Sequence, residues 1–414
     1  MSRPRRTLRN ACLTGLAAVS ALSLGVTTAT AAGSPTPADR TIASKLNVRF
    51  PAEHLGSHAS GQVMDVAAGR VVWSRNASAT LMPASTAKLA TAIAALTVLG
   101  TRHTEQTRAL LYGGSLYLVG GGDQHLTSSD LNALAAATAA ALKANHVTSV
   151  TLHVDDSLFP APTLSPGWPA DYYPGEVAPV RALALLGDRV MDTSLHAGSV
   201  FAYQLGTHGI RASGPSHGTA PRSSKFLAAR TSASLAYEID YMLKESDNDN
   251  AEGFARLTAL AQGRSADWRG ATAAVRSALT RYGVPQSGVV LYDGSGLSRS
   301  DRMTAPALAT LAGLAVDSRY HSVLWPVLPG LPVAGVDGTL GPAYGRFTTW
   351  PSDCARGKVM AKTGTLHDAV ALAGVTLGAD GRWKSFAFVE NGAPDLSSAR
   401  LGVDALAATV EGCW

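Results

Sequence analysis

The apolar and polar positions of the chain first predict a hairpin followed by a helix. Residues 61–66 and 69–74 alternate in character on either side of a short turn, which is the pattern of two paired strands. The run from Ser85 to Leu99 is rich in Ala, Leu and Ile and contains neither Gly nor Pro, so it predicts a helix. Ser85 is therefore expected at or near a helix N-terminus.

A second hairpin and one αβ unit are expected next. Residues 110–112 and 115–119 flank a Gly-Gly turn and have the pattern of paired strands. A helix over 129–144 and an apolar strand over 149–154 follow. The glycines at 120–122 invite a phosphate-loop interpretation, but no Gly-Lys-Ser or Gly-Lys-Thr follows them. A tight strand-to-helix turn explains these glycines better.

The last part of the chain predicts a helix, three adjacent antiparallel strands and a final helix. The first helix is expected over 232–244, where apolar residues fall on one face. The strands are expected over 357–362, 369–377 and 383–390, and the final helix over 396–410. The polar segment that follows residue 244 fits a solvated turn between two apolar helices.

Two irregular segments indicate where the chain divides. Residues 159–178 are rich in Pro and Gly and predict an ordered surface loop, whereas residues 213–224 hold Gly, Pro, Ser and His without a period and predict a linker. A chain of 414 residues exceeds one typical domain, so two cores are expected. We expect one domain over 33–113 and 224–414, interrupted by an inserted domain over 114–223.

Residues 1–32 have the features of a secretory signal peptide. Four arginines precede an apolar run over 11–26, which leads to Ala29-Thr30-Ala31, a small-x-small cleavage pattern. Cleavage is expected after Ala31 or Ala32. The apolar run is shorter than the roughly 20 residues that a spanning helix needs, so no transmembrane anchor is expected after cleavage. The protein should be secreted and extracytoplasmic.

Charge and cysteine usage narrow the possible functions. The formal net charge is +5, and removal of the four N-terminal arginines leaves +1, so electrostatics give no support for nucleic-acid binding. Two cysteines then remain, Cys354 and Cys413. In an oxidising compartment an isolated pair favours a disulfide, and two thiolates are too few for a zinc site. We predict a Cys354–Cys413 bridge and no metal.

Ser85 and Lys88 form the first candidate for chemistry. Residues three apart lie on the same face of a helix, so the hydroxyl and the amine can come within hydrogen-bonding reach. A partly desolvated lysine can take the serine proton, and a helix N-terminus favours the negative charge that develops nearby. Ser-x-x-Lys also occurs by chance in many proteins, so this pair needs support from elsewhere in the chain.

Two later motifs supply that support. Ser85-x-x-Lys88, Ser246-Asp247-Asn248 and Lys362-Thr363-Gly364 follow the order of a three-part signature shared by penicillin-binding proteins and class A β-lactamases. Three weak signals in the right order make a strong one. The flanking segments 116–123 and 293–299 narrow the match. With them the chain resembles the D-alanyl-D-alanine carboxypeptidase/endopeptidase family, the class C low-molecular-mass penicillin-binding proteins, over essentially the whole mature chain.

The resemblance implies an α+β fold. Its penicillin-binding, serine β-lactamase-like domain has a five-stranded antiparallel sheet between helical layers and is interrupted by inserted domains between the first and second motifs. The insertion here, an inserted smaller α/β domain over 114–223, is short for two such domains. We therefore expect one inserted domain and at most a remnant of a second.

The resemblance also implies the roles of the motif residues. Ser85 would attack the carbonyl of the penultimate D-Ala of a peptidoglycan stem peptide, Lys88 would accept its proton, and Ser246 would relay a proton to the leaving group. Asn248 would hold the substrate amide and Lys88. Lys362 would supply positive potential. The substrate-binding motif residues would be Thr363, Gly364 and Thr365. Penicillins and other β-lactams would acylate Ser85, and no metal or organic cofactor is implied.

A pocket that reads the stem-peptide side chain is also implied, with weaker assignments. Arg299 is the first candidate by motif position, and the others are Asp155, Asp156, Phe159 and Leu366. A purely structural role for Asp156 and Phe159 is an equal alternative. His367 follows the third motif and is expected at the rim, because Lys88 already provides a base.

Two other functions are compatible with parts of the pattern. A secreted serine β-lactamase or esterase shares the Ser-x-x-Lys chemistry, but segment 293–299 and the large insertion argue against it. A non-catalytic peptidoglycan-binding module is disfavoured because all three motifs are intact. The sequence does not separate carboxypeptidase from endopeptidase action, since the two differ only in the leaving amine.

Overall fold

The computed structural model describes residues 34–53, 55–56 and 58–414. The expected signal peptide, 1–32, lies outside the described residues and stays a prediction. Within the described ranges, no helix is both long enough and apolar enough to cross a bilayer.

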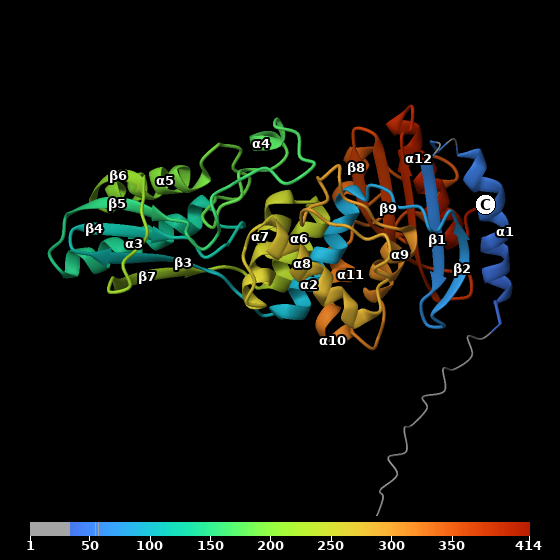
Figure 1. The fold of residues 1–414 in the computed structure, drawn as a ribbon, viewed down its shortest axis with the longest axis horizontal. Coiled ribbons are helices and arrows are strands. Elements are labelled where there is room, and N and C mark those ends of the chain that lie inside the picture. Colours follow the sequence, from blue (N-terminus) through green and yellow to red (C-terminus); the bar gives the residue numbers. More distant parts are fainter. Residues whose placement is uncertain (1–33, 54, 57) are drawn as a thin grey trace, which may run out of the picture. The chain divides into compact units, whose positions relative to one another are not determined.

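The main sheet joins the two ends of the described chain. Its five strands run in the order β2-β1-β10-β9-β8, and every neighbouring pair is antiparallel, as expected (Figure 1). The N-terminal strand β1 pairs with the C-terminal strand β10 over its whole length, beginning with His58 opposite Asn391. The strands are β1 (His58–Asp65), β2 (Arg70–Arg75), β8 (Met360–Leu366), β9 (Ala369–Leu377) and β10 (Trp383–Asn391).

Helices cover both faces of this sheet. Neighbouring residues of β9 point to opposite faces, so alternate residues of this strand belong to different cores. Val370 and Leu372 pack with α1 (Pro37–Ala52) and α12 (Leu396–Glu411). Ala371 and Ala373 belong instead to the core that contains α2 (Lys88–Val98), α6 (Leu235–Glu245), α7 (Asn248–Ala261), α8 (Trp268–Leu279) and α9 (Ala305–Leu314). The α+β fold with a sheet between helical layers is therefore confirmed.

Helix α1 was not predicted. Thr36 caps its N-terminus in a capping box with Asp39, and Pro37 occupies its first turn. Ile42, Leu46 and Phe50 are spaced four apart and are buried against the sheet. Both signals are present in the sequence.

A second sheet has its own core. Its order is β6-β5-β4-β3-β7, with β4, β5 and β6 parallel and β3 antiparallel to both of its neighbours. Helices α3 (Ser128–Ala144) and α5 (Thr193–Thr207) share this core, which makes a small α/β unit. The strands are β3 (Gln106–Tyr112), β4 (Ser115–Val119), β5 (Ser149–Asp155), β6 (Arg211–His217) and β7 (Lys225–Thr231).

The structure corrects the expected edges of this unit. β3 and β7 lie outside 114–223 but pair with each other in the second sheet. The expected linker over 213–224 begins inside β6, which holds no large apolar side chain, is mostly exposed and pairs with β5. A strand that gains its partner from a distant segment leaves little trace in local sequence. The expected loop over 159–178 holds only the short helix α4 (Tyr172–Gly175).

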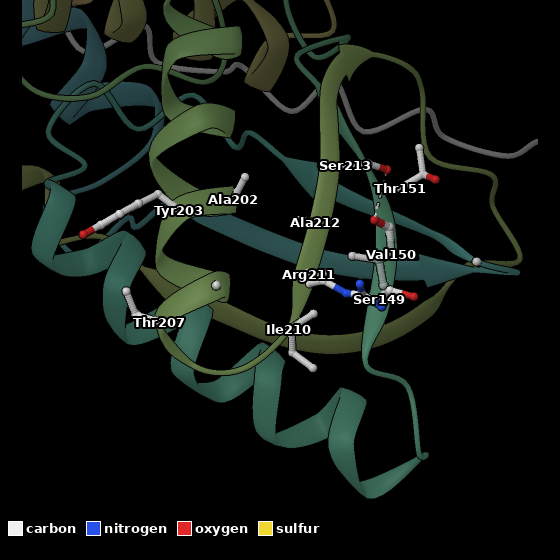
Figure 2. Close-up of a pocket in the computed structure, with 12 residues that line it drawn as sticks. Ser149, Val150, Thr151, Ala202, Tyr203, Thr207, Ile210, Arg211, Ala212 and Ser213 are labelled. Carbon is white, nitrogen blue, oxygen red and sulfur yellow. Dashed lines mark hydrogen bonds between the residues drawn. The ribbon is translucent and has the colours of Figure 1, made fainter.

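A cavity of about 1020 Å³ opens on the second unit. Figure 2 shows it between α5 and the adjoining strands, with exposed Tyr203 on the helix. The residues that line it are Gly114, Ser149, Val150, Thr151, Ala202, Tyr203, Gly206, Thr207, Ile210, Arg211, Ala212 and Ser213.

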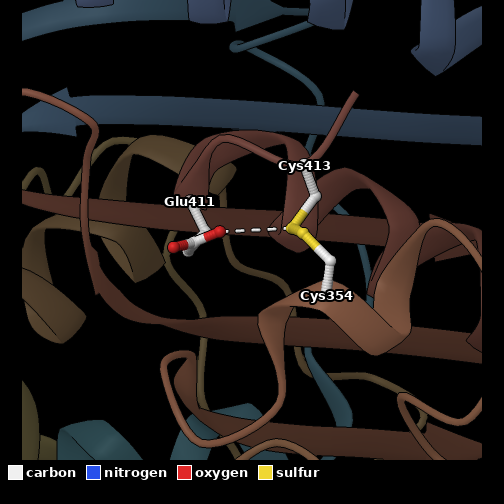
Figure 3. A group of neighbouring side chains, drawn as sticks. All are labelled: Cys354, Glu411 and Cys413. Atoms are coloured by element: carbon white, nitrogen blue, oxygen red, sulfur yellow. Dashed lines mark hydrogen bonds between the residues drawn. A yellow bond between two sulfur atoms is a disulfide. The ribbon is translucent and has the colours of Figure 1, made fainter.

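Cys354 and Cys413 form a disulfide, with their Cα atoms 6.1 Å apart (Figure 3). Cys354 lies in the short helix η5 (Ser352–Ala355), and Cys413 follows the end of α12. The bridge therefore ties the C-terminus to the segment before β8, as predicted.

Candidate active site

Ser85 lies in a short 3-10 helix, η1 (Ala84–Ala87), and the α-helix α2 begins at Lys88. The expected helix start at or near Ser85 is thus a tighter turn that leads into the α-helix. Ala84 has a φ of 47°, a left-handed conformation that is uncommon for a residue with a side chain. Such strain is typical of functional sites, where the surroundings hold it in place.

Lys88 is fully buried and its amine has three oxygen partners. Its Nζ atom lies 2.9 Å from Ser85 Oγ, 2.7 Å from Asn248 Oδ1 and 2.8 Å from the carbonyl oxygen of Ser295. Burial lowers the pKa of Lys88 to about 8, although nearby acids, Asp293 first among them, oppose this shift. An amine with such a pKa is partly neutral near neutral pH and can then accept a proton from Ser85.

The second motif lies at the junction of α6 and α7. Ser246 has a φ of 61° and ends α6, and Asp247 caps α7 by accepting a hydrogen bond of 2.7 Å from Asn250 N. The expected polar turn is therefore short, because α7 begins at Asn248. The Asn248 amide donates to the carbonyl oxygen of Glu176 at 2.8 Å while its own oxygen accepts from Lys88.

The third motif forms β8, whose Lys362 is also fully buried. Lys362 Nζ donates to Ser246 Oγ at 2.8 Å and to the carbonyl oxygen of Thr363 at 3.0 Å. Burial, and then the charge of Lys88, hold the pKa of Lys362 well below its usual range. The two buried amines thus each contact one serine hydroxyl.

A cleft of about 220 Å³ brings the three motifs together. Four of its lining residues are expected ones, and the other four come from segments that the sequence did not single out for chemistry. Thr339 is bonded to Thr363 through the two hydroxyls at 2.7 Å. The lining residues are Ser85, Ser246, Thr363 and Thr365, together with Thr339, Tyr344, Arg346 and Arg400.

Comparison with known proteins identifies the group to which this arrangement belongs. A model of the D-Ala-D-Ala carboxypeptidase 3 (S13) family matches residues 42–191 and 185–410. The chain belongs to this family. It is 33% identical to carboxypeptidase DacB of Mycolicibacterium smegmatis, over 92% of this chain and 85% of the relative. It is 28% identical to a D-alanyl-D-alanine carboxypeptidase of Actinomadura sp., over 80% of this chain and 77% of the relative.

A solved structure supports the fold of this S13 family member. Penicillin binding protein 4 (dacB) from Haemophilus influenzae superposes with a TM-score of 0.72 at 24% identity, covering 88% of this chain and 97% of that one. The chain therefore has the expected penicillin-binding fold.

Arg299 and Leu366, two of the expected side-chain readers, lie near the third motif. Arg299 makes a bidentate ion pair with Asp368, with both bonds at 2.8 Å. Leu366 is buried in a small apolar cluster with Trp168 and Tyr172. His367 is exposed, which fits its expected place at a rim.

None of the five expected readers lines the Ser85 cleft in the described part of the chain, and the other three lie in different surroundings from Arg299 and Leu366. Asp155 ends β5 and accepts hydrogen bonds from Ser157 and from Ala220 N. Asp156 pairs with Arg181 at 2.8 Å, and Phe159 is buried in the main core. Because these local contacts occupy them, none of the three lines the Ser85 cleft in the described part of the chain.

Two groups of described side chains have spacings suited to a metal, and each is already occupied. Asp39, Asp65 and Asp380 surround the amine of Lys384. Glu411 lies beside Cys354 and Cys413, whose sulfurs are bonded to each other (Figure 3). Neither group lines the cleft.

Proposed function

We propose that this protein is a serine-type D-Ala-D-Ala carboxypeptidase that acts on peptidoglycan stem peptides through an acyl-enzyme at Ser85. One observation carries the proposal: Lys88 Nζ lies 2.9 Å from Ser85 Oγ in the cleft where Lys362 contacts Ser246. Membership of the S13 family gives the same reaction class.

Acylation begins at Ser85. In its neutral form Lys88 takes the hydroxyl proton while Ser85 Oγ attacks the carbonyl carbon of the penultimate D-Ala. The backbone N–H groups of Ser85 and Thr365 stabilise the negative charge that develops on the carbonyl oxygen. Their closeness is supported by Gly364, where an added Cβ would stand 3.2 Å from Ser85 N.

Departure of D-Ala needs a proton on its nitrogen. Ser246 relays that proton, and Lys362 behind it supplies positive potential. Thr363 and Thr365 bind the terminal carboxylate, and Asn248 holds the substrate amide and orients Lys88. Water then hydrolyses the acyl-enzyme, which regenerates Ser85 and releases the shortened peptide.

We also propose that penicillins inhibit this protein at the same serine. A β-lactam amide mimics the scissile D-Ala-D-Ala amide, so Ser85 attacks its carbonyl, opens the ring and becomes acylated. Peptidoglycan stem peptides and penicillins are both encountered outside the cytoplasm. We therefore infer that the N-terminal segment directs secretion and that the mature protein associates with the cell wall. We further place side-chain recognition beside Arg299 and Leu366.

Labelling with a fluorescent penicillin tests the nucleophile. The mature protein should be labelled stoichiometrically, and Ser85→Ala should abolish the label. A peptide map that locates the adduct on another serine would refute the assignment. The lifetime of the adduct distinguishes a peptidase from a β-lactamase: a long-lived label supports the peptidase, and rapid loss of the label supports the β-lactamase. Digestion of cross-linked and uncross-linked muropeptides, followed by mass spectrometry, then measures the carboxypeptidase and endopeptidase activities.

A further inference from the structure

Arg400 is a cleft residue to which the reaction above gives no role. It lies in the first part of α12, is partly buried and lines the same cleft as Ser85, Ser246 and Thr363. The three sequence motifs do not include it.

The guanidinium of Arg400 has no partner among the described residues, since no hydrogen bond or ion pair joins it to any of them. Its natural partner would be Asp404, four residues later on the same face of α12. Asp404 is fully buried, and its two oxygens instead accept from Arg346 at 2.8 Å and 2.5 Å. The acid that would neutralise Arg400 is thus bound by another arginine.

Two arginines line the cleft, and within the described part of the chain Arg400 is the one whose charge no acid balances. No Asp or Glu is among the lining residues, and the charge of Arg346 is balanced by Asp404. The two buried lysines are held by serines and carbonyl groups. A guanidinium remains protonated at all working pH values, and its planar donors match a carboxylate in two-point contact.

We propose that Arg400 binds the carboxylate carried by the carbon next to the scissile amide nitrogen, and so selects substrates whose leaving amine has an adjacent carboxylate. This inference rests on the proposed function. Thr363 and Thr365 donate hydrogen bonds to the same carboxylate, and Arg400 adds the charge. The terminal D-Ala of a stem peptide has this group. The D-centre of a diamino acid in a cross-link also has it unless that carboxylate is amidated.

The test uses the mature full chain and a pair of peptides: diacetyl-L-Lys-D-Ala-D-Ala and the same peptide with a C-terminal amide. Mass spectrometry measures release of D-Ala or D-alaninamide by the wild type, Arg400→Ala, Arg400→Lys and a control. The control, Arg276→Ala, removes the same charge from an exposed position on α8 that does not line the cleft.

Arg400→Ala should lower kcat/KM for the free acid by about 10- to 100-fold, the usual effect of removing a hydrogen-bonded ionic partner, and leave the amide peptide unaffected. Arg400→Lys should recover part of the loss, and Arg276→Ala should match the wild type. An unchanged kcat/KM for the acid overturns the inference. An equal loss on both peptides also overturns it, because that result indicates a structural role. If the wild type releases no D-Ala, the proposed function itself fails.

Discussion

Gly364 and Ser85 approach each other so closely that a side chain at Gly364 would not fit. An added Cβ would lie 3.2 Å from Ser85 N and 2.7 Å from the carbonyl oxygen of Pro83. Strand β8 therefore runs in direct contact with the turn that presents the proposed nucleophile. The glycine of the third motif sets the spacing between the two backbones whose N–H groups we assign to the carbonyl oxygen.

Gly364→Ala should slow acylation because the new methyl group meets backbone atoms that cannot move aside cheaply. A displacement of about 1 Å in a catalytic site costs on the order of a hundredfold in rate. The rate constant for labelling by fluorescent penicillin measures this loss. Gly206→Ala is the control, because an added Cβ there meets no atom within 4 Å. A wild-type rate in Gly364→Ala would show that the contact does not set the site.

Lys88 gives the acylation rate a defined dependence on pH. Burial lowers its pKa to about 8, so the neutral amine that accepts the Ser85 proton increases as pH rises through that value. The labelling rate should rise from pH 6, be about half-maximal near pH 8 and level off roughly one unit above that value. Lys88→Ala should lose several orders of magnitude, whereas Lys225→Ala, an exposed lysine on β7, should keep the wild-type profile. A flat wild-type profile would place the base elsewhere.

The sequence predicted the main sheet well because its strands carry their own signals. Residues 369–377 are a largely apolar run, residues 383–390 hold an apolar centre at 386–389, and both segments are bounded by turns; the structure places them in β9 and β10. The edge strand β6 left no such signal, since most of its residues are exposed and its partner β5 lies far away in the sequence. Local patterns report burial and turn chemistry, and pairing of a polar edge strand depends on neither.

The same limit applies to the cleft. Ser85, Ser246 and Lys362 were recognisable because each belongs to a short motif with a known chemical spacing. Arg346 and Arg400 were not, because the fold alone brings them to the cleft and no motif contains them. The two arginines differ because Arg346 is paired with Asp404 and Arg400 is not. That difference depends on side-chain contacts in the folded protein, which the sequence does not reveal.

Lys384 holds α1 on the main sheet through buried acids. Its amine lies 2.7 Å from Asp39 and 3.0 Å from Asp65, and all three side chains are buried. Lys384→Met should destabilise the fold by about 3 kcal/mol, the lower end for breaking a buried ion pair, since Arg70 and Arg382 also contact these acids. Urea unfolding measures the change, with the exposed Lys358→Met as the control.

Acid should reduce the effect of Lys384→Met. Burial by itself would raise the pKa of Asp39, but its bonds to Lys384, Thr36 and Arg70 outweigh this and lower the pKa to about 2. A carboxylate with a lowered pKa stabilises the fold above its unfolded value near 4 and loses that effect as pH falls through about 2. The stability difference between wild type and variant should therefore shrink between pH 4 and pH 2. A constant difference would contradict this assignment.

The Cys354–Cys413 disulfide should stabilise the fold without taking part in the reaction. It closes a loop across 59 residues of sequence separation. By the chain-entropy model such a loop contributes about 4 kcal/mol. Cys354→Ala/Cys413→Ala should lower the melting temperature and keep the wild-type labelling rate at temperatures where it is folded, because neither sulfur lines the cleft. Thiol counting on the unreduced, unfolded mature protein is the direct check. Two free thiols, or a dimer that a reducing agent dissolves, would show that the bridge does not form within one chain.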